Sequence, residues 1–313
     1  MNKEYEFTVF SPCYNSEKFI KRTYESLKNQ VFKDFEWLVI DDCSSDSTPN
    51  ILNKLKQESK IQINLVKNNS NKMLAYNCNL AVTIAKGKFF IFLGHDDELV
   101  PSALQRFHEV WKNIPSDKKN ELVGMMSNCQ DEQGLFVHDE LPEPPVITDF
   151  FNMYHNFGIK GEKCFCYKTE IMLKQNFSTV DKYVPENVLL MNISDQYKTY
   201  FFNENLRIYH TKHESFSNSL HAQDRIRYPI GMRYEKLQDL NRRAQKLKLT
   251  PIFFIKTIIN FMRFTFHSNI STRDSLSEIS LTSIKIFAIL LIPVSTLLYL
   301  NDKIKLKLAV NEQ

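Results

Sequence analysis

Two pairs of adjacent carboxylates, each directly after an apolar run, are the residues of this sequence best suited to chemistry. Asp41 and Asp42 follow the run at 35–40, and Asp96 and Asp97 follow a second such run. Carboxylate oxygens on a tight turn suit a hard divalent cation that also holds phosphate oxygens. A single Asp-Asp pair is most often a solvated turn, but two pairs at two strand ends favour a binding site.

The apolar runs before these pairs read as buried parallel strands. The second run covers 89–93, and a third expected strand at 7–10 ends in the polar loop 11–16. Helical patterns separate the strands, which predicts an α/β fold with a mostly parallel sheet flanked by helices. Because ligands bind at the carboxyl ends of such strands, we expect the three loops to form one site.

Further elements follow from apolar spacing and from helix-start and helix-stop residues. Gly87 is expected just after the third helix, as its C-terminal cap. Helices are expected at 17–29, from 47 onward, at 72–86 and at 101–113, and strands at 61–66 and 121–129.

Composition excludes several classes of protein. The 40 Lys and Arg against 36 Asp and Glu give a net charge of +4, too mild to indicate nucleic-acid binding. With 7 glycines and neither a dinucleotide-binding fingerprint nor a P-loop, phosphate would have to be held by a metal and side chains. The six cysteines lack zinc spacing and the start of the chain is polar, which indicates a reducing cytoplasmic compartment and no signal peptide.

The last third of the chain has a different character. In the stretch 252–267 the polar residues fall on one narrow helical stripe, so the segment is a core helix or lies in a membrane interface. A second apolar stretch at 286–300 is interrupted by Pro293 and followed by the basic segment 302–307. It is short for a bilayer span, so we expect a helical amphipathic extension attached to a membrane surface, with core packing or a true span as alternatives.

With these loops described, the chain resembles family 2 glycosyltransferases of the GT-A fold. The first acidic segment, Asp-Asp-x-Ser-x-Asp from Asp41, and the second acidic motif at this separation are jointly specific. The match covers about the first 110 residues. Its elements are the segments 11–15, 39–48, 72–77, 85–87 and 93–97, with Gln30, Asn69 and Pro101.

The resemblance implies a nucleoside-diphosphate sugar as donor, with UDP as the expected nucleotide. It assigns this donor to Pro12, Cys13, Tyr14, Asn15, Asp41, Asp42, Lys72, Asn77 and Asp96. Asp42 would bond the base with Asp41 beside it, and the loop from Pro12 would pack around base and ribose. Asp96 and Asp97 would hold Mg²⁺ or Mn²⁺, which offsets charge on the leaving diphosphate.

The chain departs from the family pattern at two positions. Gly94 stands where many relatives have a carboxylate, and Asn187 stands where relatives have the Asp of a Glu-Asp pair. Inverting members need a carboxylate base for the acceptor hydroxyl, and Glu186 is the candidate here, with Asp181 and Asp195 as fallbacks. Alternatively, Glu186 caps the next helix.

Further polar residues look familiar within a bacterial polysaccharide subgroup. Lys163, Arg207 or His210 could contact the diphosphate or the acceptor, or could form surface ion pairs instead. His95 lies inside the acidic motif at a slot that varies in the family, and we expect no role for it.

The resemblance and the residues together predict a metal-dependent, inverting glycosyltransferase. Residues 1–225 would form the GT-A domain, with a nucleotide-sugar half at 1–115 and an acceptor half at 116–225. Residues 226–313 would form a helical, membrane-associating region. The acceptor would be a lipid-linked or growing surface glycan at the cytoplasmic face of the bacterial inner membrane.

Two alternatives remain open. Gly94 and Asn187 would also suit a catalytically degenerate transferase that serves as a binding or scaffold subunit. A sugar-phosphate nucleotidyltransferase shares the α/β layout, but the loop at 11–16 lacks the Gly, Arg and Lys that such enzymes usually carry near the first strand.

Overall fold

The computed structural model describes residues 4–135, 137, 139, 144–159, 161–210, 224–247 and 250–311. The chain divides into two compact units. The first consists of Met1–Phe177 and Leu189–His213, and the second of Ser178–Val188 and Glu214–Gln313. The functional division at residues 115 and 225 stays a prediction.

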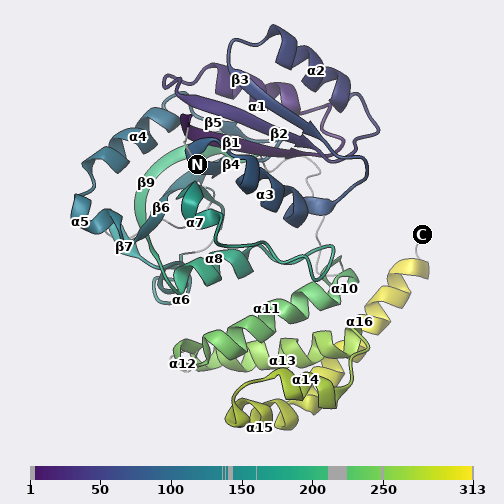
Figure 1. Ribbon diagram of the computed structural model, residues 1–313. Helices are drawn as coiled ribbons and strands as arrows, with labels where there is room; N and C mark the ends of the chain where they lie inside the picture. The colour runs from purple at the N-terminus through teal and green to yellow at the C-terminus, as the bar shows by residue number, and fades with distance from the viewer. Residues whose placement is uncertain are drawn as a thin grey trace. The chain divides into compact units, whose positions relative to one another are not determined.

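The first unit contains the parallel sheet that the sequence predicts. The strands β1 (Tyr5–Cys13), β2 (Phe35–Asp41), β3 (Gln62–Lys67) and β4 (Gly87–Phe92) lie in the order β3-β2-β1-β4, all parallel. Helices alternate with them: α1 (Ile20–Lys28), α2 (Thr48–Glu58), α3 (Met73–Ile84) and α4 (Ala103–Asn113). The expected α/β class and these elements are confirmed, with boundaries within a few residues (Figure 1).

The sheet continues beyond β4 with mixed pairing. β8 (Lys163–Lys168) runs antiparallel to both β4 and β6 (Leu122–Gln130), and β9 (Lys198–Ile208) runs parallel to β6. The short strands β5 (Glu98–Leu99) and β7 (Val146–Thr148) pair antiparallel with β9. Pairing of Glu98 with Ile208 brings the end of β9 to the acidic turn after β4. Short helices complete this unit's sequence: α5 (Ser116–Lys119), α6 (Phe150–His155), α7 (Thr169–Met172) and α8 (Asn187–Ser194).

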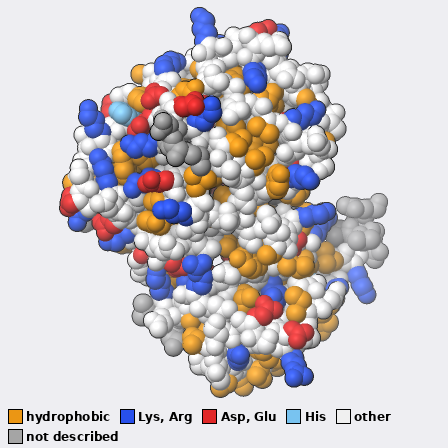
Figure 2. All heavy atoms as spheres, viewed as in Figure 1, with side chains coloured by type: hydrophobic (Ala, Val, Ile, Leu, Met, Phe, Trp, Pro, Cys, Tyr) orange, Lys and Arg blue, Asp and Glu red, His pale blue; other side chains and the backbone are white. Residues whose placement is uncertain are grey.

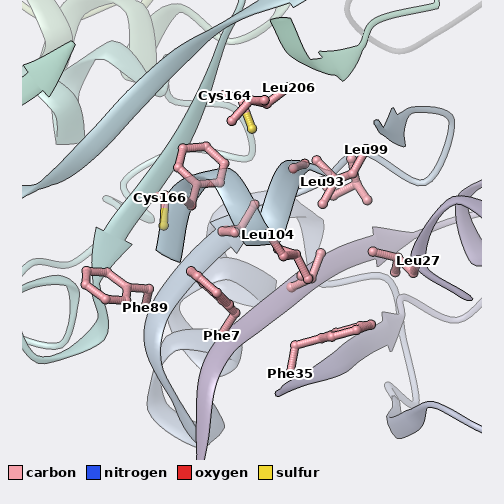
Figure 3. Packing of buried hydrophobic residues seen from close by; sticks show 14 of the residues in the cluster. Phe7, Leu27, Phe35, Phe89, Leu93, Leu99, Leu104, Cys164, Cys166 and Leu206 are labelled. Carbon is pink, nitrogen blue, oxygen red and sulfur yellow. The ribbon is translucent and has the colours of Figure 1, made fainter. Parts of the chain in front are cut away.

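The core of this unit is built from the apolar runs of the strands and the inward faces of α1 and α4. Phe7 and Phe89 on neighbouring strands have ring centroids 5.9 Å apart, and Trp111 of α4 meets Phe89 edge-on at 5.0 Å. Figure 3 shows Phe7, Phe89 and Leu104 pointing into this shared layer. Burial of such side chains stabilises by about 1.5–3 kcal/mol each and holds the strand ends in place.

Gly87 does not cap the third helix as the sequence predicts. It is the first residue of β4, and helix α3 ends before Ala85, which is extended. A Cβ at Gly87 would lie 2.1 Å from the backbone nitrogen of Thr8 on β1. Glycine is therefore required by the close approach of β1, and not by a helix end.

The second unit is helical where it is described. Its helices are α10 (Asp224–Arg227), α11 (Pro229–Arg242), α12 (Ala244–Leu247), α13 (Pro251–His267), α14 (Thr272–Glu278), α15 (Thr282–Leu290) and α16 (Ile292–Asn311). Ile258, Phe261 and Met262 of α13 are fully buried in one cluster with Leu240 and Ile284. The stretch 252–267 is therefore a core helix of this unit.

The membrane-span alternative concerns α15 and α16. Among the described helices, none is both long and apolar enough to cross a bilayer alone, and α15 and α16 pass that test only as a pair bent by 56°. The break falls at Leu291, so Pro293 lies in the first turn of α16, where proline is tolerated.

Candidate active site

The loops after β1, β2 and β4 meet at one edge of the sheet. Cys13 and Asp41 are paired residues at the ends of β1 and β2, and the next backbone N–H, of Asp42, donates to the Cys13 carbonyl at 2.8 Å. On the other side of β1, the His95 ring nitrogen Nδ1 lies 3.2 Å from the carbonyl oxygen of Pro12. The convergence that the sequence predicts is therefore present, with the β1 loop in the middle.

Hydrogen bonds to side chains join the loop after β1 to the loop after β2. The Asn15 N–H donates to Ser44 Oγ and the Ser45 N–H donates to Asn15 Oδ1, both at 2.9 Å. Asp46 accepts the Glu17 N–H at 3.1 Å. Partial burial would raise the pKa of Asp46, but hydrogen bonds from Thr48 and Glu17 outweigh it and hold that pKa below its usual value. The two loops therefore form one preorganised wall.

Three non-glycine residues of these loops have left-handed backbones. Asn15 after β1, Cys43 after β2 and Met73 after β3 have φ angles of 50°, 65° and 67°. Such angles are uncommon for side chains larger than glycine, and they gather at functional sites because the surrounding contacts must enforce them. Their clustering at one sheet edge supports a binding site there.

Asp42 is committed to the fold. Its carboxylate accepts the backbone N–H groups of Lys72 and Met73 at 2.8 and 2.9 Å, which caps the start of α3, and the Asn68 amide at 2.7 Å. The same Asn68 amide donates to Asn77 Oδ1 at 2.6 Å. Asp42 and Asn77 therefore hold the β2 and β3 loops together, and their predicted contacts with the donor stay predictions.

Asp41 differs from its neighbour. Its Oδ1 accepts the Ser44 N–H at 3.1 Å, whereas its Oδ2 is buried without a hydrogen-bond partner among the described residues. A buried carboxylate oxygen without a donor is costly, which makes it a natural acceptor for a ligand N–H. Burial and then the charge of Asp41 raise the pKa of Cys13, so that thiol stays neutral.

Tyr14 and Lys72 are two of the predicted donor-binding residues whose side chains are exposed. Tyr14 is 49% exposed, and Lys72 is exposed with its Nζ 5.9 Å from the centroid of the Tyr76 ring. An aromatic ring and an ammonium group at this edge can stack on a base and contact phosphate.

The acidic turn after β4 is fixed by helix α1. The Thr23 hydroxyl lies 2.8 Å from the His95 carbonyl and 2.9 Å from the Asp97 carbonyl, and Arg22 donates to the carbonyl of Asp96. With His95 tied to the β1 loop, the turn is held from both sides. Thr23 and Arg22 are contributions that sequence reasoning missed, since helical residues carried no signal for them.

Asp97 is bound by two residues that lie more than 100 positions later in the sequence. Its Oδ2 accepts both Nε, at 2.9 Å, and Nη2 of Arg207, and its Oδ1 accepts the His210 N–H at 3.2 Å. Burial would lower the pKa of Arg207, but the Asp97 charge outweighs it and raises that pKa. The metal-ligand role of Asp97 stays a prediction, and it would compete with this ion pair.

Gly94 lies between the two carboxylates of the turn. A Cβ built there would lie 2.8 Å from both Asp96 Oδ1 and Asp97 Oδ2. The two carboxylates thus converge above Gly94, and a third acidic side chain at this position would have to displace them. The departure from the family pattern therefore has a local steric basis.

The other charged residues singled out from sequence lie in ion pairs or hydrogen bonds. His210 has Nε2 2.8 Å from Glu98 and Nδ1 3.1 Å from Glu132. The Lys163 ammonium donates to Asn128 Oδ1 at 2.7 Å. These contacts neither support nor contradict a role of His210 or Lys163 in binding the diphosphate or the acceptor, which stays a prediction.

The candidate bases belong to different units. Glu186 is exposed and directly precedes α8, and it belongs to the second unit, as does Asp181. Asp181 accepts the Gly231 N–H at 2.9 Å and the Lys182 N–H at 2.7 Å, so it serves the fold of that unit. Asp195 belongs to the first unit. Glu186 stays the predicted base.

Comparison with known proteins agrees with this geometry. Residues 8–174 match the family described as Glycosyl transferase family 2. A Campylobacter jejuni GalNAc(5)-diNAcBac-PP-undecaprenol beta-1,3-glucosyltransferase is 27% identical over 214 residues, which are 65% of this chain. The match spans 64% of that relative's length.

Solved structures share the fold. Staphylococcus aureus TarS 1-349 in complex with UDP-GlcNAc matches with a TM-score of 0.52 and 20% identity, over 91% of this chain and 78% of that one. The mannosyltransferase PcManGT from Pyrobaculum calidifontis, in complex with GDP-Man and Mn²⁺, matches with a TM-score of 0.55 and 14% identity, over 96% and 88%.

Proposed function

This chain belongs to glycosyltransferase family 2, and we propose that it moves a sugar from a UDP-sugar to a lipid-linked or growing surface glycan at the cytoplasmic face of a bacterial membrane. The observation that carries the proposal is the buried Asp41 Oδ2, which has no hydrogen-bond partner among the described residues and lies at the edge where the loops after β1, β2 and β4 meet. Two comparisons support these substrates. A protein with the same fold has been solved in complex with UDP-GlcNAc, and the name of the Campylobacter jejuni relative contains an undecaprenol-linked acceptor.

In this proposal Asp41 recognises the base. Asp42 already accepts three donors, two on Oδ1 and one on Oδ2, and two of them are the backbone N–H groups that start α3. Asp41 Oδ2 can accept an imide N–H of uracil without loss of a protein hydrogen bond. Tyr14 and Lys72 supply movable side chains for the base and the phosphates, and Pro12, Cys13 and Asn15 shape the wall.

A divalent cation fits Asp96. No cluster of three or more His, Cys, Asp or Glu side chains that could hold a metal occurs in the described part of the chain. Mg²⁺ or Mn²⁺ is commonly held by one or two carboxylates together with substrate phosphates, and Asp96 converges with Asp97 above Gly94. When bound, such an ion would offset charge on the leaving diphosphate. Asp97, held by Arg207, would orient the turn or join as a second ligand.

Glu186 is proposed as the base of a single, inverting displacement. The acceptor oxygen bonds to the anomeric carbon, the bond from that carbon to the diphosphate oxygen breaks, and the acceptor proton passes to the Glu186 carboxylate. An exposed carboxylate at the start of α8 suits a role toward a bulky acceptor.

The proposal is tested by calorimetric titration of UDP and GDP into the full chain, with Mn²⁺ and then with EDTA. We expect UDP binding that depends on Mn²⁺ and is lost in Asp96→Asn. The matched control is Asp117→Asn, an exposed carboxylate of α5, which should bind like the wild type. Binding of neither nucleotide by a folded protein would overturn the donor assignment.

Turnover is tested separately. With undecaprenyl-diphosphate-linked sugar acceptors and UDP-sugars, Glu186→Gln should retain UDP binding and lose transfer by at least about a hundredfold. UDP binding without transfer by the wild type across acceptors would favour the binding-subunit alternative. Release of pyrophosphate from UTP and a sugar phosphate would favour the nucleotidyltransferase.

A further inference from the structure

Helix α16 exposes its apolar side chains. The large apolar residues on its exposed surface are Val294, Leu297, Leu298, Leu300, Ile304 and Leu308. Leu297 and Ile304, two turns apart, are 67% and 59% exposed. At 3.6 residues per turn these positions gather on one side of the helix, which leaves an apolar face, interrupted by the exposed Asn301, without a partner in the described chain.

The side of α16 that faces α13 combines a buried polar contact with an aromatic one, since the Tyr299 ring lies 4.7 Å from the His267 ring. Asp302 accepts Nε of Arg263 at 2.6 Å and Nη2 at 2.7 Å, and it lies 2.9 Å from Nε2 of His267. Ser295 is also fully buried. Asp302 and Tyr299 therefore hold α16 against α13 while six large apolar side chains of the helix stay exposed, unlike an ordinary surface helix, which buries its apolar stripe.

Helix α15 extends the same kind of surface. Ile286, Phe287, Ile289 and Leu290 are each more than half exposed, whereas Ile284 and Ala288 are fully buried. Together α15 and α16 expose ten large apolar side chains in one bent pair of helices. Hydrophobic side chains are visible along the lower edge of the molecule in Figure 2, where these helices lie. Contiguous exposed apolar surface of this kind marks an interaction site.

The charged residues on this surface indicate which kind of partner binds it. The charged residues between 282 and 308 are Lys285, Lys303, Lys305 and Lys307, all cationic, and Asp302, which is buried in its clamp. Lys305 and Lys307 project on either side of the line from Leu297 to Ile304, so their stems can lie along apolar surface while the ammonium groups reach phosphates. A second copy would bring the same cations together, whereas anionic lipid complements them.

We propose that α15 and α16 lie in the interface of an anionic bilayer, with the apolar face at the acyl boundary and the lysines among lipid phosphates, and do not span the membrane. A span by this pair, which is bent by 56°, would carry Asp302 of α16 toward the acyl layer and away from Arg263 and His267. The inference rests on the second unit alone and goes beyond the transfer reaction.

The first test is sedimentation of the full chain with phosphatidylcholine vesicles, with and without about a quarter phosphatidylglycerol. We expect binding to the anionic vesicles and release by high salt. Leu297→Glu combined with Ile304→Glu should weaken binding at least about tenfold. The matched control is Leu135→Glu, which changes a leucine of the first unit that is 66% exposed and should bind like the wild type.

The second test keeps the proposal falsifiable if the glutamate variant is unstable. Trp37 and Trp111 are buried in the first unit, so a Leu297→Trp reporter responds alone. Its emission should shift to the blue with anionic vesicles and be quenched most by lipids brominated near the headgroup. Strongest quenching by bromine near the bilayer centre would overturn the surface arrangement.

Two other outcomes would also overturn the inference. One is equal sedimentation with and without vesicles of either composition. The other is a dimer in solution that Leu297→Glu dissociates, since the occupant would then be a second copy. Neither outcome depends on UDP titration, so failure of the proposed donor site and failure of this inference are distinguishable.

Discussion

Arg207 forms an ion pair with Asp97, which lies 110 residues earlier in the sequence, and its Nε is 2.9 Å from Asp97 Oδ2. Both side chains are almost fully buried. The pair ties the end of β9 to the acidic turn after β4. Because a buried ion pair keeps a fixed geometry, it sets the position of Asp96, the adjacent residue that we propose as the metal ligand. Arg207 is therefore a positioning residue in the proposed mechanism.

We predict that Arg207→Gln lowers the free energy of unfolding by about 3–5 kcal/mol, because it leaves the Asp97 charge buried and unpaired. Urea denaturation measures this loss. The double variant with Asp97→Asn should be less destabilised than the sum of the single changes, since the two residues interact directly. Strict additivity would show that the pair is not coupled.

Substitution of Asp41 should affect UDP binding, whereas substitution of Asp42 should affect stability. Asp41→Asn removes an acceptor that the described protein leaves unused, so we expect UDP affinity to fall about ten- to a hundredfold with little loss of stability. Asp42→Asn weakens the cap of α3 and should cost about 1–3 kcal/mol in unfolding free energy. Calorimetry and thermal unfolding of both variants check this, and the reverse pattern would restore Asp42 as the base contact.

Gly94 should be intolerant of any side chain. In Gly94→Ala the new methyl meets the carboxylates of both Asp96 and Asp97, so at least one of them must rotate. We expect Mn²⁺-dependent UDP binding to weaken about tenfold while metal-independent binding changes little. Unchanged metal dependence would show that the space above Gly94 does not matter for the cation.

Replacement of Cys43 by glycine should stabilise the folded protein. Its φ of 65° lies in the left-handed region, which costs about 1–2 kcal/mol for a residue with a Cβ. After the entropy that glycine adds to the unfolded chain, Cys43→Gly should raise the unfolding free energy by about 0.5–1 kcal/mol. Cys43→Ala keeps the Cβ and serves as the control, so an equal gain in that variant would assign the effect to the thiol instead.

The clamp at Asp302 should make the second unit sensitive to acid. Burial lowers the pKa of His267, and its stabilising contribution is therefore full above the unfolded value of about 6.5 and is lost as the pH falls below it. Burial would raise the pKa of Asp302, but hydrogen bonds from Arg263 and His267 hold it below its usual value, so its contribution is lost below about pH 4.

Thermal unfolding of the full chain between pH 7 and pH 3 measures this dependence. We expect His267→Gln to flatten the profile just below about pH 6.5, because the variant cannot take up that proton. Asp302→Asn should cost about 3 kcal/mol at pH 7 and remove the loss below about pH 4. A wild-type profile that rises as the pH falls would contradict the assignment.

Local patterns were sufficient for the parallel half of the fold. The strands β1, β2, β3 and β4 and the helices between them follow from apolar runs and helix-start residues, which are encoded within a few positions. The mixed half was harder to predict. β5 is two residues long and directly follows the acidic turn, and its pairing with β9 depends on residues that are distant in sequence.

The apolar C-terminal third shows the same division. Composition placed helices there, yet α13, with its wide apolar face, is a core helix, whereas α16, which carries Asp302 and three lysines, exposes most of its leucines. Which face is buried depends on the clamp between α13 and α16, which no single window of sequence contains.

The sequence by itself determined the fold class, the family and the edge of the sheet where the site lies, because hydrophobic periodicity and short acidic motifs are local properties. Only the tertiary structure decided that Asp42 caps α3 and that Asp97 is held in a buried ion pair. Asn68, Arg207 and the start of α3 reach Asp42 and Asp97 from elsewhere in the chain. The chemistry of two neighbouring, identical side chains is set by such distant partners.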